Sequence, residues 1–198
     1  MSDRETLKIY DAQEETYENL TKNDAGNADL QAFIAALPRG ARVLDLGCGP
    51  GLYAEKMAQA GLMVEAWDAS QSMVALADAK QGVEAFQKTF DALKDASGFD
   101  GIFANFSLLH AKRAMVPEYI ASAAAALNPK GVFHIGMKIG AGEARDSIGR
   151  HYCYFTEEEL VQILEKVALS IFHRNHGRDR GLSGEMADWV SLQARKEH

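Results

Sequence analysis

The chain has 198 residues, of which 47% are hydrophobic and 25% charged, a composition that suits one globular domain. Its formal net charge of −7 argues against a nucleic-acid partner, because a phosphate backbone repels an acidic chain that has no concentrated basic patch. The sequence has no apolar run of the roughly 20 residues that a membrane helix needs, no export signal and only two cysteines, so we expect a cytoplasmic protein without a membrane partner.

Apolar periodicity predicts helices and strands that alternate along the chain. The predicted elements are a helix at 30–37, a strand at 43–46, a helix at 52–60, a strand at 62–67, a helix at 71–79, strands at 83–87 and 99–104, a helix at 115–127, a strand at 132–139, a helix at 157–166, and strands at 168–173 and 186–194. This alternation predicts an α/β fold with a parallel sheet covered on both faces and an antiparallel hairpin at its end.

Caps and loops complete this prediction. Ser70 is expected to cap the helix that follows it, and Thr156 with Glu159 forms a capping box. The basic stretch at 173–180 is interpreted as a solvated loop between the last two strands. The segment 140–154 is interpreted as a second long loop, beside the edge of the sheet where ligands bind.

The stretch 43–51 carries the clearest functional pattern. A short apolar strand runs directly into Gly47, Gly49 and Gly51, after which a helix begins. Glycines let a ligand approach the backbone closely, and the N–H groups at a helix start favour a carboxylate-bearing ligand. Asp68 stands 21 residues after Gly47, at the end of the next strand, where a carboxylate can accept hydrogen bonds from both hydroxyls of a ribose.

The glycine pattern is also compatible with a dinucleotide-binding domain. Residues 49–54 satisfy a loose G-x-G-x-x-G/A pattern, which leaves an NAD(P)-dependent oxidoreductase as one alternative. Against it, the strand ends at Gly47, too early for that frame, and a frame that starts at Gly47 places Leu52 where the third glycine belongs.

The sequence resembles the small class I S-adenosylmethionine-dependent methyltransferases, including those related to the trans-aconitate and ubiquinone-pathway enzymes. The resemblance covers roughly 11–196 and rests on VLDLGCGPG at 43–51, AWDASQSM at 66–73, FDA at 90–92, FDGIFAN at 99–105, LNPKG at 127–131 and YFTEEEL at 154–160. It implies one Rossmann-like, doubly wound domain over 1–198, with a helical lid at 1–40 and a core at 41–198. The implied seven-stranded sheet has the order 3-2-1-4-5-7-6 with an antiparallel last strand.

The resemblance also assigns residues to S-adenosylmethionine, whose product is S-adenosylhomocysteine. It places Asp45, Gly47 and Gly49 beside the methionine part, Asp68 and Ala69 at the ribose, Met73, Asp91 and Ala92 at the adenine, and Asn105 near the reacting sulfonium. It implies nothing as specific about the acceptor, which we expect to be a small molecule. Besides the NAD(P)-dependent oxidoreductase, the alternative to methyl transfer is a module that binds S-adenosylmethionine without catalysis.

Acceptor contacts are expected from residues outside that donor set. His110 follows the fourth strand at the ligand end of the sheet and is, with Asn105, a catalytic candidate. Tyr10 and Tyr17 of the N-terminal region, with Arg150 and Tyr152 of the segment 140–154, are substrate-binding candidates.

The remaining side chains are expected to contact the acceptor or to have structural roles. Arg145 and Arg150 are interpreted as a clamp for an anionic acceptor, and Lys138 as another acceptor contact. His134 is expected to be a hydrogen-bonded histidine beneath a helix. The pair His173 and His176 lacks further ligands at matching spacing, so no metal site is expected. The oligomeric state is expected to be a monomer or a homodimer.

Overall fold

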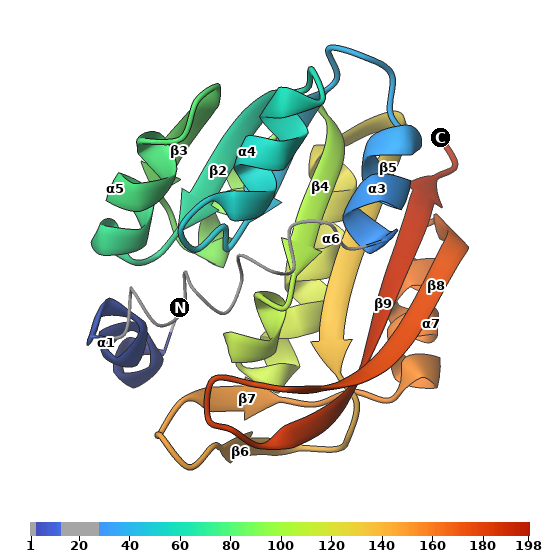
Figure 1. Ribbon diagram of the computed structural model, residues 1–198. Helices are drawn as coiled ribbons and strands as arrows, with labels where there is room; N and C mark the ends of the chain where they lie inside the picture. Colours follow the sequence, from blue (N-terminus) through green and yellow to red (C-terminus); the bar gives the residue numbers. More distant parts are fainter. Residues whose placement is uncertain (1–2, 13–27) are drawn as a thin grey trace.

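The computed structural model describes residues 3–12 and 28–198, which form an α/β fold (Figure 1). In chain order its elements are α1 (Arg4–Ala12), α3 (Ala28–Ala35), β1 (Arg42–Leu46), α4 (Leu52–Gln59), β2 (Met63–Asp68), α5 (Gln71–Asp78), β3 (Val83–Gln87), the 3-10 helix η2 (Phe90–Asp95), β4 (Phe99–Asn105), the 3-10 turns η3 (Leu108–His110) and η4 (Arg113–Met115), α6 (Val116–Ala126), β5 (Leu127–Lys138), β6 (Glu143–Arg145), β7 (His151–Cys153), α7 (Glu157–Lys166), β8 (Leu169–Arg180) and β9 (Met186–Lys196).

Seven strands form one sheet in the order β3-β2-β1-β4-β5-β9-β8. The pairs from β3 to β5 are parallel, whereas β9 lies antiparallel to both β5 and β8. Since β8 and β9 are the sixth and seventh strands of this sheet, the fold class and the strand order implied by the resemblance are confirmed. The carboxyl ends of β1, β2 and β4 therefore meet at one edge, which is where open α/β sheets bind ligands.

Two layers of helices cover the sheet, one on each face (Figure 1). The helices α3, α4 and α5 pack on one face in a core that includes Phe33, Met57 and Ala77. The helices α6 and α7 pack on the other in a core that includes Ile120 and Leu164. No residue of α1 belongs to either core, and in the part of the chain that is described no helix is long and apolar enough to cross a membrane.

The predicted caps are present in the structure. The Ser70 hydroxyl accepts a hydrogen bond from the Met73 N–H, and Thr156 forms the expected reciprocal capping box with Glu159. One boundary moved: β5 begins at Leu127, five residues before the predicted start at 132. The stretch between these two positions is an irregular part of the strand, in which Lys130 has a φ of 66°.

Two predicted loops were wrong in whole or part. The stretch 173–180 is not a loop, because β8 continues through it and pairs with β9 as far as Arg180. His173 and Asn175 are half-buried while Arg174 and His176 are exposed, so the polar residues alternate with the period of a strand. The segment 140–154 contains a small antiparallel hairpin, β6 paired with β7, instead of being irregular throughout.

Candidate functional site

The glycine loop after β1 is held against two neighbouring strands. Gly47 has a φ of 74°, and a Cβ added to it would lie 2.3 Å from the Ser107 Cβ, so only glycine lets this loop pass the end of β4. The N–H groups of Gly47 and Cys48 both donate to the Trp67 carbonyl, and the Gly49 N–H donates to Asp68. The loop and the acid that the sequence separates by 19 or more residues thus form one unit.

Asp68 uses one lone pair on each carboxylate oxygen to hold this loop. Its Oδ2 accepts the Gly49 N–H at 2.9 Å and its Oδ1 accepts the Ser70 N–H at 2.9 Å. A carboxylate oxygen has a second lone pair, so both oxygens can still accept a ligand hydroxyl. This is the chemistry that a ribose requires.

Asp45 is buried one strand residue before the loop, and within the described residues its Oδ2 has no hydrogen-bond partner. Burial, reinforced by the charge of Asp68, raises the pKa of Asp45 to about 8. An unpartnered buried carboxyl group beside the loop is suited to a cationic group of a ligand, which would restore its ionised form.

A cavity of about 710 Å³, its open mouth included, lies at this edge of the sheet. We call it the first cavity; its wall includes the predicted residues Gly47, Gly49, Asp68, Ala69, Met73, Tyr10 and His110. Its size falls within the roughly 300–1,000 Å³ of small-molecule sites. Backbone donors, carboxylates and the buried Met73 thus meet in one space that fits a nucleoside-bearing amino acid.

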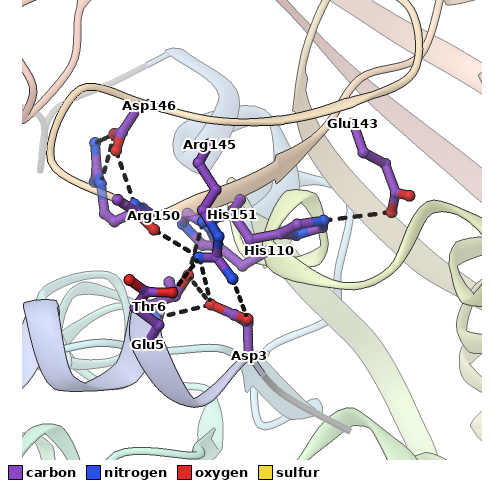
Figure 2. Close-up of polar contacts among 10 residues, drawn as sticks. Asp3, Glu5, Thr6, His110, Glu143, Arg145, Asp146, Arg150 and His151 are labelled. Carbon is purple, nitrogen blue, oxygen red and sulfur yellow. Dashed lines mark hydrogen bonds and ion pairs between the residues drawn. The ribbon is translucent and has the colours of Figure 1, made fainter.

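The first helix, α1, crosses this cavity and is fastened at both ends. At one end the hydroxyls of Ser70 and Ser72 donate to the Asp11 carboxylate. At the other end, Figure 2 shows Asp3 facing Arg145, with an Arg145 Nη2 to Asp3 Oδ1 distance of 2.9 Å. The ion pair with Arg145 holds the pKa of Asp3 well below its usual range. Because α1 belongs to neither core, these polar contacts are a main part of what keeps it in place.

The last turn of α1 reaches the loop after β4 through Tyr10. Its hydroxyl lies 2.8 Å from His110 Nε2 and accepts a hydrogen bond from Arg150 Nη1 at 2.9 Å. His110 Nδ1 lies 2.7 Å from the His151 carbonyl oxygen, to which only an N–H can donate. His110 is therefore the Nδ1–H tautomer, and its Nε2 accepts the Tyr10 O–H.

His110 is neutral in this arrangement. Burial lowers its pKa to about 3, and the nearby charge of Arg150 acts in the same direction, against the hydrogen bond to His151. A group with such a pKa holds a proton poorly near pH 7, so the geometry favours His110 as a hydrogen-bond acceptor over His110 as a general base.

Some predicted cofactor residues lie outside the cavity wall. The Asn105 Oδ1 accepts a hydrogen bond from His134 Nε2 at 3.0 Å. The Asp91 carboxylate accepts from Tyr119 and Thr89, and the Ala92 N–H donates to the Thr89 carbonyl. Their assignments to the cofactor remain predictions. Tyr17 lies outside the described residues.

Both arginines of the predicted clamp have carboxylate partners in the structure. Arg145 pairs with Asp3 and Glu5 of α1. Arg150 is 2% exposed and lies 2.8 Å from Asp146, which is 3% exposed. A guanidinium has five N–H donors, so the contact of these arginines with an anionic acceptor stays a prediction. The remaining substrate candidate, Tyr152, is buried with its ring centroid 4.7 Å from that of His110.

Other expectations concern the strands behind the site. His134 is fully buried and stacks on Phe103 at 4.1 Å between ring centroids, as expected for a packed histidine. His173 contacts Asp29, whereas His176 contacts Glu157, so the two histidines are engaged separately.

Sequence reasoning missed several residues of the cavity wall. Phe106, Ser107, Trp67, Lys88 and Thr89 all line the first cavity. Their positions in the chain could have indicated these residues. Phe106 and Ser107 follow β4 directly, and Trp67 precedes Asp68 at the end of β2. Phe106 also has a φ of 52°, which the sequence does not reveal because bulky residues seldom adopt it.

Comparison with known proteins identifies a family. A family model described as a methyltransferase domain matches residues 20–173. A curated relative from Geobacillus sp. (strain WCH70), named as a methyltransferase, is 39% identical over 64 residues, which are 30% of this chain and 26% of that protein. The match to this relative therefore spans about a quarter of its length.

Solved structures agree in fold. The 1,6-didemethyltoxoflavin-N1-methyltransferase of Burkholderia thailandensis has a TM-score of 0.77 at 24% identity, over 98% of this chain and 88% of that one. A methyltransferase structure from Methanosarcina mazei has a TM-score of 0.72 at 18% identity, over 86% and 97% of the two chains. These likenesses confirm the fold, and the family model confirms the resemblance and S-adenosylmethionine as the cofactor. The NAD(P) alternative has no support among these matches.

Proposed function

The chain belongs to the methyltransferase domain family, and on that premise we propose that it transfers a methyl group from S-adenosylmethionine to a small-molecule acceptor. The observation that carries this proposal is the union of Gly47, Gly49 and Asp68 in the wall of one cavity of suitable size, with the buried Asp45 just before the glycine loop. When bound, S-adenosylmethionine supplies a methyl group that is already strongly electrophilic. The protein therefore has mainly to align the acceptor and exclude water.

Each residue of the site has a proposed part in that task. Asp68 accepts the two ribose hydroxyls through its free lone pairs, and Asp45 offsets the ammonium of the methionine part. The backbone at Gly47 and Gly49 permits close approach, and Met73 packs against the adenine. The helix α1 acts as a lid that keeps water from the reacting centre. The proposed lid includes α1, whereas α3, which was predicted to belong to a lid at 1–40, packs in the core of the sheet, so the proposed core begins before residue 41.

The proposed role of His110 is to hold Tyr10 in position. The neutral imidazole accepts the Tyr10 O–H and so holds Tyr10 at the boundary of the cavity. With a pKa of about 3 it is unsuited to deprotonate an acceptor near pH 7. We therefore expect an acceptor whose attacking atom already carries a free electron pair, or one whose proton leaves to solvent.

The structural neighbour from Burkholderia thailandensis was solved with bound 1,6-didemethyltoxoflavin and S-adenosylhomocysteine, which supports a small acceptor here. A polymer is not the proposed substrate. The chain is acidic, and Arg174 and Arg178 of β8 lie beside Glu157 and Asp188, at 2.9 and 3.6 Å, so these basic side chains do not form an unopposed patch.

Calorimetry and mass spectrometry test this proposal. S-adenosylmethionine and S-adenosylhomocysteine should bind and raise the melting temperature, while NAD should do neither. Incubation of extract small molecules with methyl-labelled S-adenosylmethionine should yield a labelled product that requires the protein. Tight binding of NAD without a response to S-adenosylhomocysteine would contradict the proposal, and donor binding without any labelled product would favour a non-catalytic module.

A further inference from the structure

A second cavity adjoins the first and shares Tyr10, Phe106 and His110 with it. Its volume is about 880 Å³ with its open mouth included. The rest of its wall comes from Leu109 of η3, Lys138 at the end of β5, Arg150 and Tyr152 at the start of β7, and the tip of the β8–β9 hairpin, including Asp179, Arg180 and Trp189. The stretch 173–180 of this hairpin was interpreted from sequence as a solvated loop, so the part of Asp179 and Arg180 in the wall was not expected.

Trp189 is an aromatic residue of this cavity wall that three contacts hold in place. It pairs across the strands with Gly177, where an added Cβ would lie 2.2 Å from the indole ring. Its indole N–H donates to the Asp179 carboxylate at 2.7 Å, and the edge of Phe106 meets it at 5.8 Å between centroids. A rigid indole held in this way offers a flat apolar face to a ligand ring.

In the described wall of this cavity three cations, Lys138, Arg150 and Arg180, stand against one carboxylate, Asp179. The Asp179 carboxylate accepts the Trp189 N–H, and Asp146 lies behind Arg150. Lys138 is half-buried with its ammonium 3.9 Å from the centre of the Tyr152 ring, and within the described residues it has no carboxylate within 4.0 Å. Burial lowers the pKa of Lys138, as does the nearby charge of Arg150, so a ligand anion would stabilise its charged form.

We propose that the second cavity holds the acceptor, and that this acceptor is a planar aromatic or heteroaromatic molecule with an anionic group directed to Lys138. This inference rests on the proposed function, since it deepens the substrate class of the same site. The ring lies against Trp189, and the atom to be methylated lies at the boundary formed by Tyr10, Phe106 and His110, where the two cavities meet. Lys138 is thereby a specificity-determining residue remote from the donor residues.

The test uses three matched probes on the full chain saturated with S-adenosylhomocysteine. These are 2-naphthoate, neutral 2-naphthamide and the saturated analogue decahydro-2-naphthoate, each titrated by calorimetry. The naphthoate should bind about tenfold more tightly than either of the others, because one lacks the charge and the other the aromatic face.

Variants separate the two recognition elements. Lys138→Met should weaken naphthoate binding about tenfold and leave naphthamide unchanged, while Lys138→Arg should retain the preference. Lys166→Met removes an exposed positive charge on α7 and serves as the control. Gly177→Ala should displace Trp189 and weaken both aromatic probes, with S-adenosylhomocysteine affinity unchanged.

Two results would overturn the inference: equal binding of naphthamide and naphthoate, or naphthoate affinity unaltered in Lys138→Met. Failure of all three probes to bind would also overturn it. The proposed function fails separately, through absence of S-adenosylhomocysteine binding or of labelled product, neither of which depends on these probes.

Discussion

The Tyr10 hydroxyl lies 2.8 Å from His110 Nε2, and this contact joins the first helix to the loop after β4. Both residues line both cavities, so the pair stands between the space assigned to S-adenosylmethionine and the space proposed for the acceptor. Burial raises the pKa of Tyr10 and lowers that of His110, which keeps both groups neutral and the hydrogen bond intact across the physiological range.

Tyr10→Phe should impair acceptor turnover more than donor binding. The variant retains the ring but leaves His110 Nε2 and the Arg150 guanidinium without the hydroxyl, a loss of about 1–3 kcal/mol for buried groups. We expect kcat/KM for the acceptor to fall roughly tenfold or more. Steady-state kinetics and donor calorimetry measure the two effects. Tyr154→Phe is the control, since in the described part of the chain its hydroxyl makes no hydrogen bond.

Asp68→Ala should weaken S-adenosylhomocysteine binding by about 1.5–3 kcal/mol, roughly ten- to a hundredfold. The substitution removes the carboxylate that is proposed to accept from the ribose. The same carboxylate accepts the Gly49 N–H and so orders the glycine loop. Asp95→Ala removes an exposed carboxylate at the end of η2 and should bind as the wild type does. Equal affinity in the two variants would contradict the ribose assignment.

Removal of residues 1–20 should leave a folded protein with impaired turnover. No residue of α1 contributes to either core, so the sheet and its covering helices keep their packing. The first cavity loses Tyr10 and its other α1 residues, and we expect faster dissociation of S-adenosylhomocysteine together with slower methyl transfer. Circular dichroism and stopped-flow displacement measure these quantities. A truncated protein with full turnover would show that α1 is not a functional lid.

Asp45 should make stability depend on pH in the absence of ligand. Burial, with the charge of Asp68, raises its pKa from 3.8 to about 8. The folded state therefore binds the Asp45 proton more tightly than the unfolded state does. The stability that this proton contributes is lost progressively as the pH rises from the unfolded pKa of 3.8 through the folded pKa of about 8. Asp45→Asn should reduce the decline between pH 5 and pH 8.5, with a slope change of up to about 1.4 kcal/mol per pH unit.

Urea unfolding at several pH values measures that slope. Asp95→Asn changes an exposed carboxylate and should leave the wild-type slope in place. An Asp45→Asn protein with an unaltered pH profile would mean that Asp45 is ionised in the folded state and that its carboxyl group is not the buried acid described here.

Arg150→Met should destabilise the protein more than the double variant Arg150→Met/Asp146→Asn. Both side chains are almost fully buried, so the single change strands the Asp146 carboxylate at a cost of about 3–5 kcal/mol. The double variant removes the stranded charge but keeps an oxygen for the backbone N–H groups of Ile148 and Arg150. Thermal unfolding compares them, and a double variant no more stable than the single one would argue against a buried ion pair.

The sequence by itself determined the local parts of this protein. The alternation of apolar runs predicts the elements, since it reflects which face of each helix or strand is buried. The run from Val43 to Gly51 and the acid at Asp68 predict the cofactor edge, because a strand end, a glycine turn and a helix start are adjacent in the chain. The capping of Ser70 and Thr156 was predictable for the same reason.

Only the tertiary structure decided what surrounds that edge. Tyr10 and His110 are 100 residues apart, and no local pattern reveals that they meet. The stretch 173–180 looks like a solvated loop because its residues are polar, yet β9 supplies partners for its backbone, and strand pairing depends on a segment elsewhere in the chain. Arg150 looks like a free cation until Asp146 is placed against it. The surroundings of Tyr10, His110 and Arg150 depend on such long-range contacts, whereas the glycine loop is built from neighbours in sequence. The sequence therefore predicted these residues as acceptor candidates but not how they are joined.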